Sequence, residues 1–317
     1  MFISEVKSNL GEDISILIRK DNHSWNYLCE CGEASELTVK EIQQIRAIFI
    51  SHTHIDHFVN FDTIVRHQIG IERTVVVCGP KGISDQVASR LRGYTWNLVA
   101  ENAIKYQIRE ILEEGQVKTY EVIPPYWRLK EIEMDSENKI YENEAFAVSY
   151  TLLDHKTPSV AYRFTEQDRV KISLDTCSFK GGVWVGELKT AFANNDVDRE
   201  IDVEGTLYKA EELFSLLCLQ KGDSLGVIMD HAANERNHHK INKLFKNCNT
   251  VFIESFYKNE DKELAVLNYH SYARKSGEIM KKAEVEKAIP VHFSRKYKEK
   301  DLKALEKEFY AAWKEGG

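Results

Sequence analysis

The stretch SHTHIDHF, residues 51–58, places three histidines and one aspartate within six positions, directly after the apolar run 45–50. That run predicts a buried strand, and the sites of α/β proteins form where such strands end. His52 and His54 alternate, so on an extended backbone both side chains point the same way. With Asp56 and His57 in the next turn, the cluster suits two adjacent metal ions, since zinc accepts imidazole and carboxylate ligands. The competing interpretation is an exposed polar turn.

The composition is that of an ordinary soluble globular protein, with 317 residues, 43% of them hydrophobic and 29% charged. The net charge of -7 does not support general affinity for nucleic acid. No run of about 18 apolar residues occurs, and charged residues interrupt the N-terminal segment, so we expect neither a membrane span nor a signal peptide. The six scattered cysteines predict a cytoplasmic location, with Cys29 and Cys31 in the core.

Short apolar runs bounded by turn residues predict strands at 14–19, 25–30, 45–50, 74–78, 145–153, 160–164, 225–230, 250–255 and 287–292. Helical patterns predict helices at 38–44, 82–92, 208–220, 237–247, 271–284 and 300–314, with Ser271 as an N-cap. Strands come first and then alternate with helices, which predicts a layered α/β fold. No linker rich in proline, glycine or serine divides the chain. We therefore expect a single domain, 1–317, with an inserted arm at about 165–210.

Several motifs, taken in order, resemble a known family. HTHIDH matches the HxHxDH signature of the metallo-β-lactamase superfamily. The segment from His270 to Tyr297 resembles the C-terminal block of the ribonuclease Z branch, with a His-Ser helix start and then a strand ending in His-Phe-Ser-x-x-Tyr. CGPKGI (78–83) and HKTPSVAYRF (155–164) resemble further blocks of the same branch. The likeness implies a four-layer αβ/βα sandwich that holds two zinc ions, with Mn²⁺ or Fe²⁺ as alternatives.

The resemblance also implies a ligand for each position around those ions. His52 and His54 would bind the first ion, and Asp56 and His57 the second. Each ion needs one further histidine from a later strand end. His155 follows the run 145–153 and would complete the first shell, and His292 ends the run 287–292 and would complete the second.

Two aspartates compete for the role of bridging carboxylate. Asp175 stands in LDT, which imitates the Gly-Asp-Thr that superfamily members often present. Asp230 ends the run 225–230, after the glycine-rich stretch KGGVWVGELK and a leucine-rich segment, which is the order of the ribonuclease Z branch. Order and spacing favour Asp230, and Asp175 stays open as the alternative.

The family mechanism implies roles for a few more residues. A metal-bound hydroxide attacks a phosphodiester, with Asp56 as the general base. Glu254 would orient His270, which would protonate the leaving group. Ser294 and Tyr297 lie beside His292 in the sequence and would contact the substrate phosphate.

The resemblance specifies the reaction more closely than it specifies the substrate. The likeness implies a homodimer, away from membranes, that hydrolyses RNA or a smaller phosphodiester. Between Phe164 and Ala210, however, nine acidic residues stand against six basic ones, which suits a clamp for RNA phosphates poorly. Two alternatives therefore stay open: a hydrolase of a small ester, lactone or thioester, and a non-catalytic binding protein.

Overall fold

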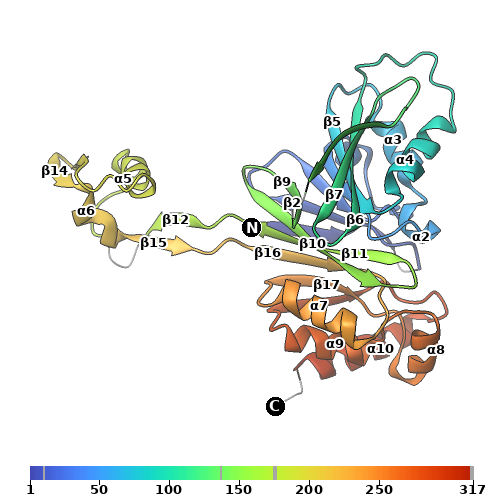
Figure 1. Cartoon of the computed structure of the whole chain (residues 1–317). Helices are drawn as coiled ribbons and strands as arrows, with labels where there is room; N and C mark the ends of the chain where they lie inside the picture. Colours follow the sequence, from blue (N-terminus) through green and yellow to red (C-terminus); the bar gives the residue numbers. More distant parts are fainter. Residues whose placement is uncertain (10, 136–137, 174–176, 315–317) are drawn as a thin grey trace. The chain divides into compact units, whose positions relative to one another are not determined.

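The computed structural model describes residues 1–9, 11–135, 138–173 and 177–314 (Figure 1). Two compact units divide the chain. The first comprises Met1–Thr165 and Ser224–Gly317, and the second comprises Glu166–Asp223. Among the described residues, no helix is both long and apolar enough to cross a membrane.

The first sheet of the larger unit takes its strands in sequence order, with eight strands among the described residues. They are β1 (Phe2–Val6), β2 (Ile16–Lys20), β3 (Asn26–Cys29), β4 (Ile45–Phe49), β5 (Thr74–Pro80), β6 (Lys105–Glu113), β7 (Gln116–Val122) and β8 (Lys130–Asp135). The strands from β3 to β6 run parallel to one another. Helical connections precede β4, β5 and β6, namely α1 (Val39–Gln43), α2 (Ile55–Phe58), α3 (Phe61–Gln68) and α4 (Ile83–Arg92).

The second sheet has the strand order β18-β17-β16-β11-β10-β9. Its strands are β9 (Lys139–Glu142), β10 (Phe146–Asp154), β11 (Pro158–Glu166), β16 (Ser224–Ile228), β17 (Thr250–Glu254) and β18 (Lys287–Val291). The last three strands run parallel. The helices of this half are α7 (Glu235–Phe245), α8 (Lys262–Leu267), α9 (Ala273–Lys282) and α10 (Glu299–Lys314).

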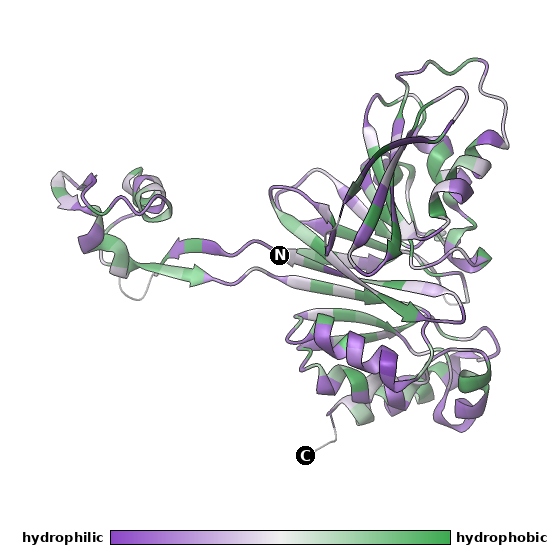
Figure 2. Ribbon diagram, in the orientation of Figure 1, coloured by the Kyte–Doolittle hydropathy of each residue, from purple (hydrophilic) through white to green (hydrophobic). Residues whose placement is uncertain are grey.

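Three hydrophobic clusters show how the layers stack. Ile16 and Ile18 of β2 share one cluster with Phe146 and Phe252 of the second sheet, so the two sheets pack face to face. Leu17 points to the opposite face, as strand alternation requires, and packs in a cluster with residues of α3 and α4. A third cluster joins the second sheet to α7, α9 and α10. Hydrophobic residues accordingly follow the strands in Figure 2. The predicted αβ/βα sandwich is confirmed, and Cys29 and Cys31 are buried as expected.

The smaller unit has its own secondary structure and its own apolar cluster. Two hairpin-like pairs form, β12 (Arg169–Ile172) with β15 (Leu217–Gln220) and β13 (Glu200–Val203) with β14 (Thr206–Lys209). Helix α5 (Trp184–Ala193) and the short α6 (Ala210–Leu213) complete it. Trp184, Leu188 and Ile201 are central to its buried cluster. The sequence pattern did not reveal these elements.

Two local predictions were wrong. The expected helix at 208–220 is instead the short α6, a 3-10 turn at Phe214–Leu216 and strand β15, because the later apolar residues pair with β12 rather than continuing one helical face. Ser271 does not cap α9, because Tyr272 occupies the cap position and the Ser271 hydroxyl bonds the Ser276 hydroxyl at 2.8 Å. The other predicted helices and strands are present with slightly shifted ends. In the larger unit, strands β1 and β6 to β9 and helices α2, α3 and α8 were not predicted.

Helices α9 and α10 approach closely at Gly277. A Cβ atom there would lie 2.4 Å from the Phe309 carbonyl oxygen, which is backbone and cannot move aside cheaply. We therefore expect Gly277→Ala to lower the free energy of unfolding by about 1–3 kcal/mol, measured by urea denaturation. Lys282→Ala, on an exposed position of the same helix, should change it by less than about 0.5 kcal/mol. Equal stability of Gly277→Ala and the wild type would contradict this close contact.

Candidate metal centre

Polar side chains gather where strands of both sheets end. Residues 51–57 follow β4, His155 follows β10, Asp230 follows β16 and His292 follows β18. Because parallel strands present their carboxyl ends at one edge of a sheet, loops far apart in the sequence meet there. The described residues contain three groups with ligand-type atoms within 4.8 Å of one another: His52, His54, His155 and Asp230; Asp56, His57 and His292; and Asp230, Glu254 and His270.

Asp230 lies at the middle of these groups. Its Oδ2 atom is 3.7 Å from His52 Nε2, 3.5 Å from His57 Nε2 and 3.4 Å from His155 Nε2. Its Oδ1 atom is 3.4 Å from His292 Nδ1. The carboxylate is almost fully buried, at 2% exposure. One carboxylate thus faces imidazoles of both the first and the second group.

The second group is completed by Asp56, which is half-buried at the start of α2. Its Oδ2 atom is 3.5 Å from His57 Nε2 and 3.6 Å from His292 Nε2. The His57 and His292 rings stack, with centroids 4.8 Å apart and planes at 21°. Asp56 and Asp230 therefore flank the same pair of imidazoles.

Contacts on the outer side fix the orientation of three imidazoles. His52 Nδ1 lies 3.0 Å from the Ser51 hydroxyl, and His57 Nδ1 lies 3.0 Å from Glu30 Oε2. His155 Nδ1 lies 2.7 Å from the Tyr269 carbonyl oxygen. Each ring therefore turns its other nitrogen, Nε2, toward the centre. Such outer partners are what orient metal-binding histidines in proteins.

Several buried atoms at the centre have no hydrogen-bond partner among the described residues. They are Nε2 of His52 and of His57, Oδ1 of Asp230 and Nδ1 of His292. Unpaired buried nitrogen and oxygen atoms are costly in a folded protein, and buried charges are normally paired or coordinate metals. Imidazole and carboxylate donors converging in this way fit a divalent metal ion.

The electrostatics of the cluster agree with a missing positive charge. Burial lowers the pKa of His52 to about 2, with a further contribution from His57, so its imidazole is neutral and able to ligate. Burial alone would raise the pKa of Asp230, but His292 and His57 hold it well below its usual range. Burial would lower the pKa of His57, but the Asp230 and Glu30 carboxylates raise it well above normal. The Asp230 and Glu30 carboxylates thus favour a positive charge at the centre of the cluster, either as a proton or as a metal ion.

A buried ion pair adjoins the centre. Glu254 contacts Nδ1 of His270 and accepts hydrogen bonds from the main-chain N–H groups of His231 at 3.0 Å and Ser271 at 3.3 Å. Burial would raise the pKa of Glu254, but the charge of His270 lowers it to about 2. Burial would lower the pKa of His270, but Glu254 raises it. His270 Nδ1 also lies 3.8 Å from Asp230, so a protonated imidazole faces the cluster.

Phe256 links this ion pair to the second group. Its ring stacks on His270 with centroids 3.9 Å apart and planes at 6°, and it lies 5.3 Å from the His292 ring at 29°. The His270 and His292 centroids are 6.4 Å apart, so Phe256 packs against both imidazoles, and His292 also stacks on His57. The sequence reasoning missed Phe256, because no short-range pattern signals a stack between loops from different strands.

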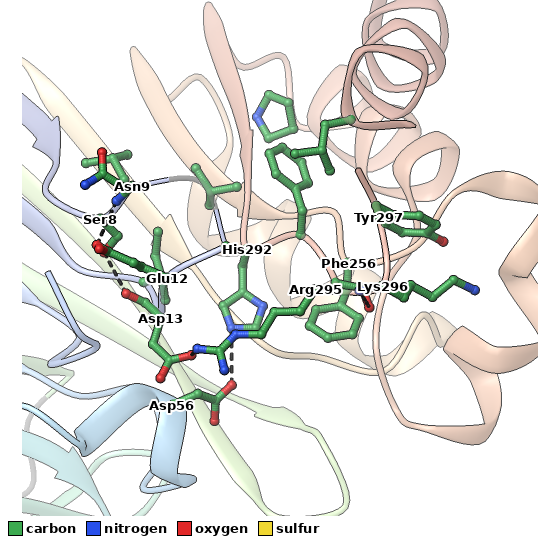
Figure 3. A pocket seen from close by; sticks show the side chains of 18 of the residues that line it. Ser8, Asn9, Glu12, Asp13, Asp56, Phe256, His292, Arg295, Lys296 and Tyr297 are labelled. Atoms are coloured by element: carbon green, nitrogen blue, oxygen red, sulfur yellow. Dashed lines mark hydrogen bonds and ion pairs between the residues drawn. The ribbon is translucent and has the colours of Figure 1, made fainter. Parts of the chain in front are cut away.

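A cavity of about 770 Å³ adjoins the centre and has Asp56, Phe256 and His292 in its lining (Figure 3). Ser294 and Tyr297 also line it. The Tyr297 hydroxyl donates to Asp261 and accepts the Lys258 main-chain N–H at 2.9 Å. Figure 3 shows the Asp56 and His292 side chains meeting at one end of the cavity. The cluster is therefore open to a ligand from this side.

An ion pair ties down the rim of the same cavity. The Arg295 guanidinium donates to Asp13 and lies 3.2 Å from Glu33 Oε2. Figure 3 shows Arg295 reaching across toward Asp13, close to Asp56. The segment after His292 is thus held to the loop between β1 and β2.

The seven ligands inferred from the sequence all fall within the first two groups, and Glu254 contacts His270. Asp175, the alternative to Asp230, lies outside the described residues. Glu30 was missed as a contributor. It is fully buried, accepts the Ser51 main-chain N–H at 3.0 Å and contacts His57. Its place directly after strand β3 was the available signal.

Comparisons with known proteins identify relatives over most of the chain. The chain is 30% identical over 304 residues to a protein named Ribonuclease Z from Borreliella burgdorferi (strain ZS7), covering 93% of this chain and 84% of the relative. No protein-family model matches the chain.

Solved structures show the same fold at low sequence identity. The metallo-beta-lactamase fold protein YhfI from Bacillus subtilis superposes with a TM-score of 0.59 at 12% identity, covering 98% of this chain and 93% of that one. The short form of human tRNase Z superposes with a TM-score of 0.55 at 14% identity, covering 89% and 86%.

The convergence of unpaired donors predicts that metal binding stabilises the fold. We expect Zn²⁺ or Mn²⁺ to raise the melting temperature of chelator-treated protein, with about 2.7 kcal/mol of stabilisation at a hundred times the dissociation constant. Asp230→Asn should lower the bound metal, measured by plasma mass spectrometry, and reduce the rise in melting temperature. Asp85→Asn, exposed on α4, serves as the control. Unchanged metal content in Asp230→Asn would remove Asp230 from the ligand set.

Proposed function

Because the chain belongs to the ribonuclease Z family, we propose that this metal-dependent phosphodiester hydrolase cleaves RNA and removes the 3′ trailer of a precursor tRNA. One observation carries the proposal. A buried carboxylate, Asp230, lies between two groups of imidazoles whose inner nitrogen atoms face one another. That arrangement is suited to a pair of metal ions sharing one bridging ligand.

The proposed ligands divide into two sets that share Asp230. One ion would bind the first group, with the ligands His52, His54, His155 and Asp230. The other ion would bind the second group together with Asp230, with the ligands Asp56, His57, His292 and Asp230. The nitrogen and oxygen donor set suits Zn²⁺ best, and Mn²⁺ or Fe²⁺ are the alternatives. When bound, two such ions lower the pKa of water and stabilise negative charge on phosphate oxygens.

Asp56 is the proposed general base. Its side chain is 36% exposed and reaches the cavity, so it can meet both the substrate and solvent. Burial would raise its pKa, but hydrogen bonding to His292 and the charge of His57 hold the pKa below its usual range. The ionised carboxylate can accept the proton that the attacking water loses and pass it to solvent through the cavity.

His270 is the proposed general acid, and Glu254 keeps it protonated and oriented. In the reaction, the water oxygen forms a bond to phosphorus while the bond from phosphorus to the 3′ oxygen breaks. The water proton goes to Asp56, and the His270 proton goes to the departing 3′ oxygen. Protonation matters most when the leaving group is a poor one, as a ribose hydroxyl is.

From the sequence, Ser294 and Tyr297 are the expected substrate contacts, and we propose that Ser294 contacts the phosphate. Both line the cavity beside His292, on the segment that follows β18. Since the Tyr297 hydroxyl is already bound to Asp261 and to the Lys258 main chain, its contribution is to hold this segment in place. The Ser294 hydroxyl accepts the Lys296 main-chain N–H at 3.5 Å, and its own hydrogen can be donated to the phosphate.

The proposal extends to the organisation of the protein. We take the chain to be a single metallo-β-lactamase-fold domain with an inserted arm at about 165–210, for which the compact unit Glu166–Asp223 is support. We take the working unit to be a cytoplasmic homodimer, as the family resemblance implies. All six cysteines are free thiols, which agrees with a reducing compartment.

One feature favours a second candidate, a hydrolase of a small ester, lactone or thioester. The segment 165–209 carries more acidic than basic residues. Nucleic-acid affinity comes largely from neutralising phosphates, which such a segment does not do. A carbonyl carbon could be attacked in the same centre, because the metal-lowered pKa of water serves both reactions.

The deciding experiment offers the zinc-loaded protein a precursor tRNA with a 3′ trailer, bis-p-nitrophenyl phosphate and an aryl ester. We expect trailer removal and turnover of the phosphodiester, with far slower turnover of the ester. Ester turnover without phosphodiester turnover would replace the proposed function by the second candidate. No turnover at full metal occupancy would indicate a binding protein instead.

The acid role of His270 predicts a dependence on the leaving group. His270→Ala should slow cleavage of precursor tRNA by about 10²–10⁴-fold, yet change hydrolysis of bis-p-nitrophenyl phosphate only slightly, because nitrophenolate leaves without a proton. Metal content should stay at the wild-type level. The exposed His239→Ala on α7 is the matched control. Equal slowing on both substrates would argue that His270 binds metal rather than acting as an acid.

A further inference from the structure

A second cavity lies at the opposite edge of the first sheet from the metal centre. It has a volume of about 410 Å³ and is lined by the starts of β4 and β5, represented by Arg46 and Thr74, and by Arg109 of β6. His52 follows the other end of β4. At about 3.3 Å per residue, Arg46 and His52 are roughly 20 Å apart, so this cavity is separate from the catalytic centre.

Two arginines line this cavity, and a third, Arg73, packs on the ring of the lining residue Trp25. Arg46 and Arg109 line it, and the Arg46 and Arg73 guanidinium carbons lie 5.5 and 5.7 Å from the ring centroid of Trp25, which also lines it. Among the described residues, no carboxylate lies within 4.0 Å of any of these guanidinium groups. The cluster therefore carries positive charge that the protein does not balance locally.

Each guanidinium is anchored by one hydrogen bond to the main chain. Arg46 Nη1 donates to the Thr74 carbonyl at 2.9 Å, and Arg109 Nη1 donates to the Ile140 carbonyl at 2.9 Å. Arg73 Nη1 donates to the Gln43 carbonyl. These bonds fix the groups in place without neutralising them, because a carbonyl oxygen carries no formal charge.

Other donors of the same groups are buried without a partner. They are Nε and Nη2 of Arg73 and Nε of Arg109. A buried charged donor without an acceptor is unfavourable, and an anion in the cavity would compensate part of the positive charge. The packing of Arg73 beside Arg46 already lowers the pKa of Arg73, after the larger effect of burial.

The acidic residues at the rim do not cancel this charge. Glu142 pairs with Lys139 at 2.7 Å, and Glu144 is exposed. Asn143 is committed, since its amide donates to the Tyr27 hydroxyl at 3.0 Å and its carbonyl accepts from two main-chain N–H groups. Gln107 and His23 complete the polar lining.

We propose that this cavity binds a phosphate group of a nucleotide, held by Arg46 and Arg109. The planar fork of a guanidinium matches phosphate oxygens in pairs, and several such forks around one cavity select a phosphate over a neutral ligand. The volume exceeds what inorganic phosphate needs, so the sugar enters with it. The phosphate comes from a free nucleotide or from an RNA strand whose cleavage point is elsewhere.

Calorimetric titration of the metal-loaded protein tests the site with inorganic phosphate, AMP, adenosine and a short single-stranded DNA as a non-cleavable strand. We expect phosphate and AMP to bind and adenosine not to bind. Arg46→Gln and Arg109→Gln should each weaken the binding of phosphate and AMP in the second cavity by about tenfold, as expected for loss of a charged hydrogen bond. Arg274→Gln, exposed on α9, is the matched control and should change nothing.

Because phosphate can also bind at the metal centre, the same variants are assayed on bis-p-nitrophenyl phosphate. The inhibition constant of phosphate in that assay should be unchanged, which assigns the lost binding to the second cavity. Arg109→Lys is the control for misfolding, because it keeps the positive charge. It should bind AMP with intermediate affinity and have the melting temperature of the wild type. This test does not depend on which bond the protein hydrolyses.

The two sources of phosphate give different results. If AMP binds and loses affinity in the arginine variants while the DNA strand does not, the ligand is a free nucleotide. If the DNA strand loses affinity in the variants, the ligand is the nucleic-acid backbone. The proposal is wrong if both affinities are unchanged in both variants, or if Arg274→Gln weakens binding as much.

Discussion

The arrangement depends on one buried carboxylate surrounded by imidazoles. Asp230 is 2% exposed and has four histidine nitrogens within 3.7 Å. Removing such a group from water costs several kcal/mol unless positive charge is placed beside it. The Oδ1 atom has no hydrogen-bond partner among the described residues, so the protein itself does not complete the compensation. The strand ends of both sheets thus converge on a point that a divalent cation stabilises.

Contacts from outside the cluster set the orientation of its imidazoles. Glu30, the Ser51 hydroxyl and the Tyr269 carbonyl each hold one imidazole by its outer nitrogen. Glu30 adopts a positive φ of 66°, and His292 one of 56°, a conformation that costs a residue with a side chain about 1–2 kcal/mol. The surrounding contacts hold both residues there. The metal centre is therefore a property of loops from two sheets, of which the histidine-rich segment is only one part.

The sequence was informative where candidate ligands are close together in the chain or follow the motif order of the ribonuclease Z branch. The candidate ligands from His52 to His292 could be assembled because the motifs follow the order of the ribonuclease Z branch and each candidate follows an apolar strand pattern. Phe256 could not be found, since its stacking on His270 and His292 joins three separate loops. The segment 208–220 was predicted wrongly because its apolar residues reach one cluster from two kinds of element. Leu213 packs there from helix α6, and Leu217, which pairs in β15, packs against the same cluster. Apolar spacing alone does not show where the helix ends and the strand begins.

The chemistry and the choice of substrate reside in different parts of the chain. A centre with two metal ions activates water against phosphorus or a carbonyl carbon alike, so it does not select RNA by itself. Selection requires charge that neutralises phosphates, and the segment 165–209 carries an excess of acidic residues. The unbalanced arginines lie elsewhere, with Arg46 and Arg73 at the amino-terminal ends of β4 and β5 and Arg109 midway along β6. In this chain, recognition of phosphate is therefore better sought on the body of the fold than on the segment 165–209.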